Sequence, residues 1–246
     1  MPTTWFETSV TRHNDPKLPS HVLKALADLG VRACDPGIGE IIEQIEEHRV
    51  DALYAARQTL PDRENRTPDP DADEWHALPC DSPEIASALL QLGHRGRALE
   101  RSVAEVSRRW SEADDWFCHF FFVESQYRRH QVGCPMAALM ALDLIDRAPG
   151  DSDAAVVRTA FEPLEFPFVW FNALYLADVV SRFPELRETD LGRELIDWVV
   201  SGQDEEGRWR ATSVFRMYKG FDFAQKREPS AWITLLCCRI LKRWFG

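Results

Sequence analysis

The sequence predicts an all-α protein that folds as a single domain. Three observations favour this fold class. Apolar residues recur at helical spacing along most of the chain, a proline stands at or near the start of several of these segments, and no segment shows a convincing strand pattern. The length of 246 residues is sufficient for one large domain and for a sizeable buried core.

The composition is that of a globular chain, and it excludes several function classes. Hydrophobic residues make up 45% and charged residues 28% of the sequence. The net charge of −11 argues against a general nucleic-acid-binding protein. No run approaches the ~20 apolar residues of a membrane-spanning helix, and the polar residues 1–17 contain no signal-peptide core. We therefore expect a cytoplasmic protein without an integral membrane segment, in which residues 1–17 form an extended arm.

The cysteines and histidines do not indicate a metal site. The six cysteines are scattered without a Cys-x-x-Cys spacing, so neither a disulfide framework nor a zinc ribbon is expected. His119 and His130 precede Cys134 without a ligand-like spacing. We expect no metal and no cofactor.

The first third of the chain is predicted to contain two helices and a loop. Residues 22–29 are apolar at helical spacing and stop at Gly30, and residues 38–56 form a second helix. Prolines and many aspartates follow, so residues 59–77 are expected to be a loop without a domain boundary.

Helices are then predicted through the rest of the chain. Ser82 and Pro83 begin one that Gly93 ends, because serine is a good N-cap, proline suits the first turn and glycine follows the last. Further helices are expected at residues 98–110, 134–149, 153–161, 168–180, 189–201 and 231–243.

Four of these helices resemble each other. They begin at or near Pro83, Pro135, Pro167 and Pro229, and they are apolar almost all round. Helices of that kind are buried on all sides. They alternate with more amphipathic helices, which indicates a helical-hairpin repeat. A closed ring of hairpins would bury one helix of each pair, so we expect such a ring.

The segment from Trp198 to Trp209 carries a motif that supports this architecture. An aromatic and an aliphatic residue begin it, and Gln203, Gly207 and Trp209 follow at fixed spacings. Glutamine can cap the carbonyl end of a helix, glycine permits a chain reversal, and tryptophan packs back over the turn. The pattern resembles the QW repeat of the squalene cyclase and prenyltransferase superfamily.

The resemblance covers residues 78–243, and the segment 215–232 is similar to short, stand-alone bacterial and archaeal members of that superfamily. It implies an α/α toroid, in which inner helices surround a cavity and outer helices wrap around them. Such a resemblance implies much more about the fold than about the activity.

The resemblance also directs attention to Asp81. Class II terpene cyclases carry an Asp-x-Asp-Asp-Thr motif at the start of an inner helix, and its middle aspartate protonates an alkene. Asp81 and Ser82 correspond to the last two positions of the motif, whereas Cys80, which cannot be that acid, stands at the middle position. Two interpretations of Asp81 stay open: a proton donor, or a charge that the helix N-terminus stabilises.

A second set of candidates precedes the last helix. Tyr218, Lys219, Asp222 and Lys226 lie on the loop that leads into it, and in a toroid such loops surround the mouth of the cavity. Together with Arg129 they could form a polar rim that binds a phosphate or carboxylate head group. The alternative is a set of salt bridges between loops.

The first turns of parallel inner helices share one end of a ring, so their side chains should meet there. Aromatic faces at this end would stabilise a carbocation, and the helix N-termini would suit an anionic group. The residues expected to surround a single pocket are Cys80, Asp81, Cys134, Trp170, Asn172 and Trp232.

These candidates support three functions. The first is a terpene cyclase-like enzyme that acts on a small hydrophobic, isoprenoid-type substrate through acid-initiated, carbocation-like cyclisation. Asp81 or Asp222 would donate the proton, and Tyr218 would stabilise the cation. The second is a transferase that binds a prenyl diphosphate at the rim, and the third is a non-catalytic binding or scaffold protein.

Overall fold

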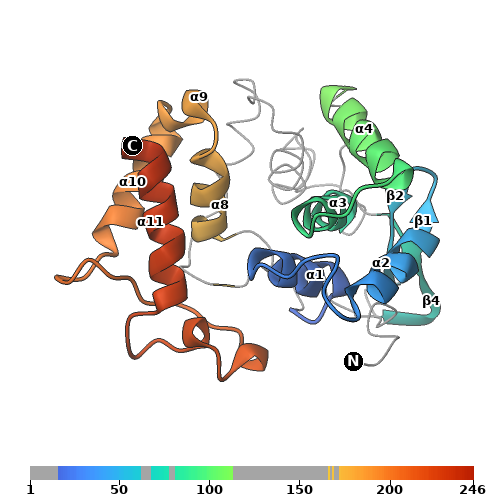
Figure 1. Cartoon of the computed structure of the whole chain (residues 1–246), viewed down its shortest axis with the longest axis horizontal. Helices are drawn as coiled ribbons and strands as arrows, with labels where there is room; N and C mark the ends of the chain where they lie inside the picture. The colour runs from blue at the N-terminus through green and yellow to red at the C-terminus, as the bar shows by residue number, and fades with distance from the viewer. Residues whose placement is uncertain (1–15, 62–67, 78–80, 113–165, 167, 169–171) are drawn as a thin grey trace. The chain divides into compact units, whose positions relative to one another are not determined.

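The computed structural model describes residues 16–61, 68–77, 81–112, 166, 168 and 172–246 (Figure 1). The chain divides into two compact units, residues 1–145 and 146–246, and we describe each unit by itself. Most of the described residues are helical, which confirms the predicted helical character. The toroidal arrangement and the single domain stay predictions. None of the described helices is both long and apolar enough to cross a membrane.

The described helices of unit 1 are α1 (Pro19–Asp28), α2 (Ile38–Glu47), α3 (Asp81–Gln91) and α4 (Arg97–Glu112). Gly30 follows α1 and Gly93 follows α3, with φ of 89° and 87°, so both predicted helix stops are confirmed. α3 packs against both α1 and α4, and its residues 81–89 are all buried. α3 is therefore the central helix of the described part of unit 1.

The prediction of one helix over residues 38–56 is wrong. α2 ends at Glu47, and β1 (Arg49–Val50) and β2 (Leu53–Tyr54) then form an antiparallel hairpin. Asp51 in its turn has φ of 56°, a left-handed conformation that aspartate tolerates better than most residues. The apolar spacing could not reveal this turn, because Val50 and Leu53 continue the helical pattern.

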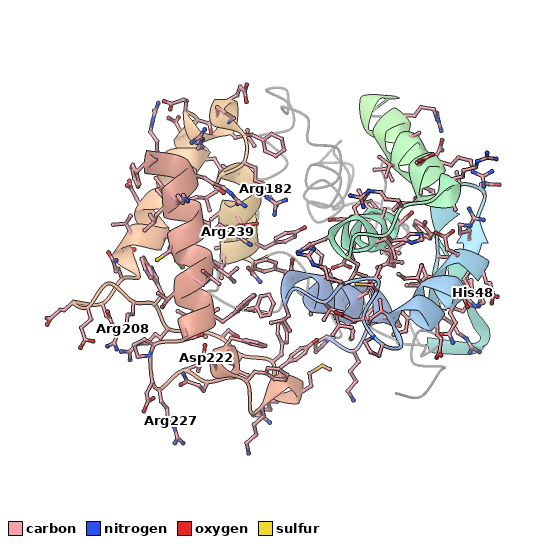
Figure 2. All side chains as sticks on the ribbon, in the orientation of Figure 1. His48, Arg182, Arg208, Asp222, Arg227 and Arg239 are labelled. Atoms are coloured by element: carbon pink, nitrogen blue, oxygen red, sulfur yellow. The ribbon has the colours of Figure 1, made fainter. Side chains whose placement is uncertain are left out.

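The expectation of a loop at residues 59–77 and of no strands is also wrong. β3 (Ala56–Pro61) pairs antiparallel with β4 (Pro68–His76). Prolines cannot donate to a ladder, but each strand of a two-stranded sheet has an outer edge where they are tolerated. The ring of His48, labelled in Figure 2, stacks on Trp75 with 3.5 Å between ring centroids. This contact connects β4 to the end of α2.

The described helices of unit 2 are α8 (Ala173–Val180), α9 (Pro184–Arg187), α10 (Asp190–Ser201) and α11 (Ala231–Phe245), with two short 3-10 turns, η2 (Arg216–Tyr218) and η3 (Asp222–Ala224). α8 is entirely buried and packs against α10 and α11. The predicted starts of α10 and α11 are confirmed, because Thr189 and Ser230 cap them with their hydroxyl oxygens.

Two details of unit 2 differ from the predictions. α8 begins at residue 173 instead of 168, because Asn172 is extended and its side chain accepts a hydrogen bond from the backbone of Tyr175. α11 is not buried on all sides: Ile233, Leu236, Cys237 and Ile240 are buried, but Leu235 is 55% exposed. One apolar stripe of α11 therefore faces the core. The helices predicted at residues 134–149 and 153–161 lie outside the described residues.

The turn after α10 has the geometry expected from the motif that ends at Trp209. Gly207 has φ of 77°, a left-handed conformation that permits the reversal. Trp209 is buried, and its indole Nε1 donates a hydrogen bond to the carbonyl oxygen of Val199 at 2.6 Å. The tryptophan thus packs back onto α10, while a capping role of Gln203 stays a prediction.

Candidate functional site

The structure describes seven of the candidate site residues. Asp81 belongs to unit 1, and the others belong to unit 2: Asn172, Tyr218, Lys219, Asp222, Lys226 and Trp232. Cys80, Arg129, Cys134 and Trp170 lie outside the described residues. The expected common pocket therefore stays a prediction, and the site has to be built separately in each unit.

A buried polar cluster lies between α1 and α3, which are packed side by side in unit 1 (Figure 1). Its members are Ser20, His21 and Lys24 from α1 with Asp81 and Glu84 from α3, each at most 1% exposed. The spacing of three or four residues on each helix puts these side chains on one face. The hydroxyl of Ser20 donates to Asp81 Oδ1 at 3.4 Å, and His21 Nε2 lies 3.7 Å from Glu84 Oε2.

Glu84 is the most unusual member of this cluster. Within the part of the chain that the structure describes, neither of its carboxylate oxygens has a hydrogen-bond partner of normal geometry. Burial raises the pKa of Glu84 well above its usual value, and the nearby carboxylate of Asp81 raises it further. The hydroxyl of Ser20 and the ammonium group of Lys24 lower the pKa, but by less. The environment therefore favours a protonated carboxylic acid at this position.

The ammonium group of Lys24 contacts Asp28 and Gln91. Its Nζ donates to Asp28 Oδ1 at 2.5 Å and to Gln91 Oε1 at 3.4 Å, and Gln91 donates to the same oxygen of Asp28 at 2.9 Å. Lys24 is thus engaged by a carboxylate one turn further along α1. The Lys24 charge lowers the pKa of Glu84, but burial and the Asp81 carboxylate outweigh that effect.

Side chains around the start of α3 fix the position of this cluster. The backbone N–H of Tyr54 donates to Ser82 Oγ at 3.0 Å, which joins β2 to the first turn of α3. The hydroxyl of Tyr54 donates to Glu46 Oε1 at 2.9 Å, and His94 Nε2 lies 3.2 Å from the same oxygen. Burial and the Glu46 contact raise the pKa of Tyr54. Tyr54 therefore contacts α3 through its backbone N–H and α2 through its neutral hydroxyl.

In unit 2, Asp222 caps the start of α11. Its Oδ2 accepts hydrogen bonds from Ser230 Oγ at 2.5 Å and from the backbone N–H of Trp232 at 2.9 Å (Figure 2). Burial alone would raise the pKa of Asp222, but the hydrogen bonds from Ser230 and from the backbone of residues 231 and 232 hold the pKa below its usual value. The ionised form is favoured, which suits a helix cap better than a proton donor.

An aromatic cluster surrounds this cap. Phe166 contacts both Phe223 and Trp232 edge-on, with ring centroids 4.7 and 5.4 Å apart. Phe223 also lies 5.1 Å from Phe221 and 6.1 Å from Tyr218. Lys219 and Lys226 are exposed on the same loop. Aromatic side chains thus lie around a preorganised helix start, and two exposed lysines lie on the loop that leads to it.

Sequence reasoning identified Asp81 but missed Glu84, His21 and Lys24. The signal for Glu84 was present, because it is a charged residue in a helix that the sequence predicts to be buried on all sides. His21 and Lys24 belong to a short helix whose packing partner lies about 60 residues further along the chain, so no local pattern identifies them. Among the described residues, no group of three His, Cys, Asp or Glu side chains is suitable for a metal ion.

No family model, curated protein or solved structure matches this chain.

Proposed function

We propose that this chain is a cytoplasmic, terpene cyclase-like enzyme with an α/α toroid fold, which starts the cyclisation of an isoprenoid-type substrate by protonation. The toroid is supported by the packing of α8 with α10 and α11, and by the Gly207–Trp209 turn. The QW-like pattern and the proline-initiated apolar helices of the sequence support the superfamily.

The observation that carries the proposed activity is the raised pKa of Glu84. Protonation of an alkene requires a carboxyl group that is still protonated near neutral pH and is shielded from water. Glu84 is suited to this role, since it is fully buried and its burial raises its pKa well above the usual value. In the sequence it stands four residues after the acidic motif position, which is occupied by Cys80.

Three side chains of the buried polar cluster then have distinct roles. The carboxyl proton of Glu84 is transferred to an alkene carbon, and the resulting carbocation is attacked by a second double bond of the substrate. Loss of a proton from the product cation to the Glu84 carboxylate completes the isomerisation without a co-reactant. Burial and, after it, the Asp81 carboxylate hold the pKa of Glu84 high, and His21, 3.7 Å from Glu84, is placed to exchange the proton.

The test is the incubation of the purified protein with linear isoprenoid hydrocarbons and prenyl diphosphates in D₂O. Protonation by an exchanged carboxyl group places one deuterium in the cyclic product, which mass spectrometry detects. We expect Glu84→Gln to abolish this product, whereas Glu40→Gln, an exposed carboxyl on α2, should leave it unchanged. A cyclic product without deuterium, or equal turnover by Glu84→Gln, contradicts the proposal.

The runner-up is a transferase that binds a prenyl diphosphate in unit 2. It is favoured by the exposed Lys219 and Lys226 beside the aromatic cluster around Phe223, because such a site offers charge for a diphosphate and apolar surface for a tail. This activity would release inorganic diphosphate, and Lys219→Gln would reduce the release. Diphosphate release that Glu84→Gln does not alter would favour this second function.

A further inference from the structure

Four charged side chains meet where α8 packs against α11, in the part of unit 2 that lies away from the aromatic cluster. Asp178 of α8, 1% exposed, contacts Arg182 in the turn that follows α8, and Arg239 and Arg243 of α11. Arg182 Nη2 lies 2.6 Å from Asp178 Oδ2, whereas Arg239 Nη2 and Arg243 Nη1 lie 2.8 and 2.9 Å from Oδ1. Figure 2 labels Arg182 and Arg239 beside these helices. We call these four residues the arginine cluster.

The charges of this cluster do not balance. Among the described residues, Asp178 is the carboxylate within ion-pair distance of Arg239 and of Arg243, and it also pairs with Arg182. One negative charge is therefore shared by several guanidinium groups. The chain as a whole has 40 acidic and 29 basic residues, so a lack of acidic side chains does not explain this excess. A pair of helices could be joined by Asp178 and a single arginine.

The arginines of α11 retain donors for a ligand. Arg239 uses Nε and Nη2 on Asp178, and Arg243 uses Nη1 on Asp178 and on the hydroxyl of Ser181. Three of their nitrogen atoms have no hydrogen-bond acceptor within the described residues: Nη1 of Arg239, and Nε and Nη2 of Arg243. These two side chains are 40% and 32% exposed, so a solute can approach them while Asp178 stays buried beneath.

We propose that the arginine cluster binds a phosphate-type dianion, either inorganic phosphate or the phosphate group of a small molecule. Guanidinium groups bind such oxyanions through paired N–H donors, and Asp178 already holds two of them on one oxygen atom. The arginines are thereby preorganised, which reduces the entropy lost on binding. A nucleic acid is a poor alternative, because the net charge of −11 repels a long polyanion. This inference does not depend on the proposed function.

A first experiment needs no variant. Calorimetric titrations of the protein with inorganic phosphate, diphosphate and sulfate, at constant ionic strength, measure binding directly. Modification of arginine by phenylglyoxal, mapped by peptide mass spectrometry, then locates the site. We expect phosphate or diphosphate to protect Arg239 and Arg243 while the exposed Arg193 is modified at an unchanged rate. If diphosphate binds more tightly than phosphate, the ligand carries a diphosphate group. If the two affinities are equal, the ligand carries a single phosphate group. Absence of binding, or protection that is equal at Arg193, overturns the proposal.

Variants provide the second test. Arg239→Gln and Arg243→Gln should each weaken phosphate binding by about tenfold or more, since each removes a charge-assisted hydrogen bond. Arg193→Gln, which removes an exposed arginine of α10, is the matched control and should bind normally. Arg239→Lys keeps the charge but loses the paired donors, and it remains informative if the glutamine variants do not fold. Undiminished binding by both folded α11 variants would show that the cluster only joins the helices.

Discussion

Replacement of Glu84 by glutamine should remove a specific pH dependence of the stability of this protein. The pKa of Glu84 in the folded chain lies well above its usual value, mainly because of burial. For a group with a raised folded-state pKa, the contribution to stability is complete below the unfolded-state pKa, about 4.3 for glutamate, and is lost as the pH rises through the folded-state pKa. The folded protein should therefore lose stability as the pH rises from about 5.

The size of the effect follows from the number of protons involved. Between the two pKa values the folded chain binds one proton more than the unfolded chain, so this group lowers the free energy of unfolding by about 1.4 kcal/mol for each pH unit. In a chain of 246 residues, such a change lowers the melting temperature by about 3–5 °C for each pH unit. Glutamine has almost the same shape as glutamate but does not titrate, so the variant should lack this loss.

Thermal unfolding followed by circular dichroism between pH 5 and pH 8 measures the effect. Other groups titrate in the same range, so the informative quantity is the difference in melting temperature between Glu84→Gln and the wild type. This difference should grow with pH, whereas Glu40→Gln, an exposed glutamate, should give a constant difference. Parallel curves for Glu84→Gln and the wild type would refute the assignment of Glu84 as a buried, protonated acid.

Three further changes test other parts of the reasoning. Trp209→Phe removes the donor to Val199 and should lower the free energy of unfolding by about 1–3 kcal/mol, measured by urea denaturation. Asp222→Ala should lower the free energy of unfolding by about 1 kcal/mol at pH 7. Because the folded-state pKa of Asp222 is lowered, this difference from the wild type should shrink as the pH falls below about 4. Asp81→Asn removes a charge that raises the pKa of Glu84, so the loss of stability with rising pH should end at a lower pH than in the wild type. The same series of thermal unfolding curves measures this change.

The sequence predicted the helices well wherever a local signal marks their ends. Thr189 and Ser230 are capping residues, and Gly30 and Gly93 have the positive φ that ends a helix, so these boundaries agree with the structure. The hairpin of β3 and β4 could not be predicted, because β4 is rich in proline and aspartate, which are depleted in strands. Its formation depends on pairing between segments and on contacts such as His48 with Trp75.

The candidate site was predictable only in part, for a related reason. The motif at the start of α3 led to Asp81, which is indeed buried among polar side chains. The importance of Glu84 depends on the packing of α1 against α3, which removes its carboxyl group from water and supplies His21 as a neighbour. Burial of this kind is a tertiary property, and the residues that produce it are far apart in the sequence.

The two carboxyl groups of α3 differ in a way that assigns their roles. Two adjacent buried carboxyl groups cannot both ionise readily, because each anion raises the pKa of the other. Asp81 accepts a hydrogen bond from Ser20, which stabilises an anion, whereas both oxygens of Glu84 lack a partner of normal geometry among the described residues. The proton therefore belongs on Glu84, whose pKa is raised first by burial and then by the neighbouring Asp81 carboxylate. This division of charge follows from hydrogen bonding and burial alone, and it would hold whether the proton serves a reaction or only allows α1 and α3 to pack.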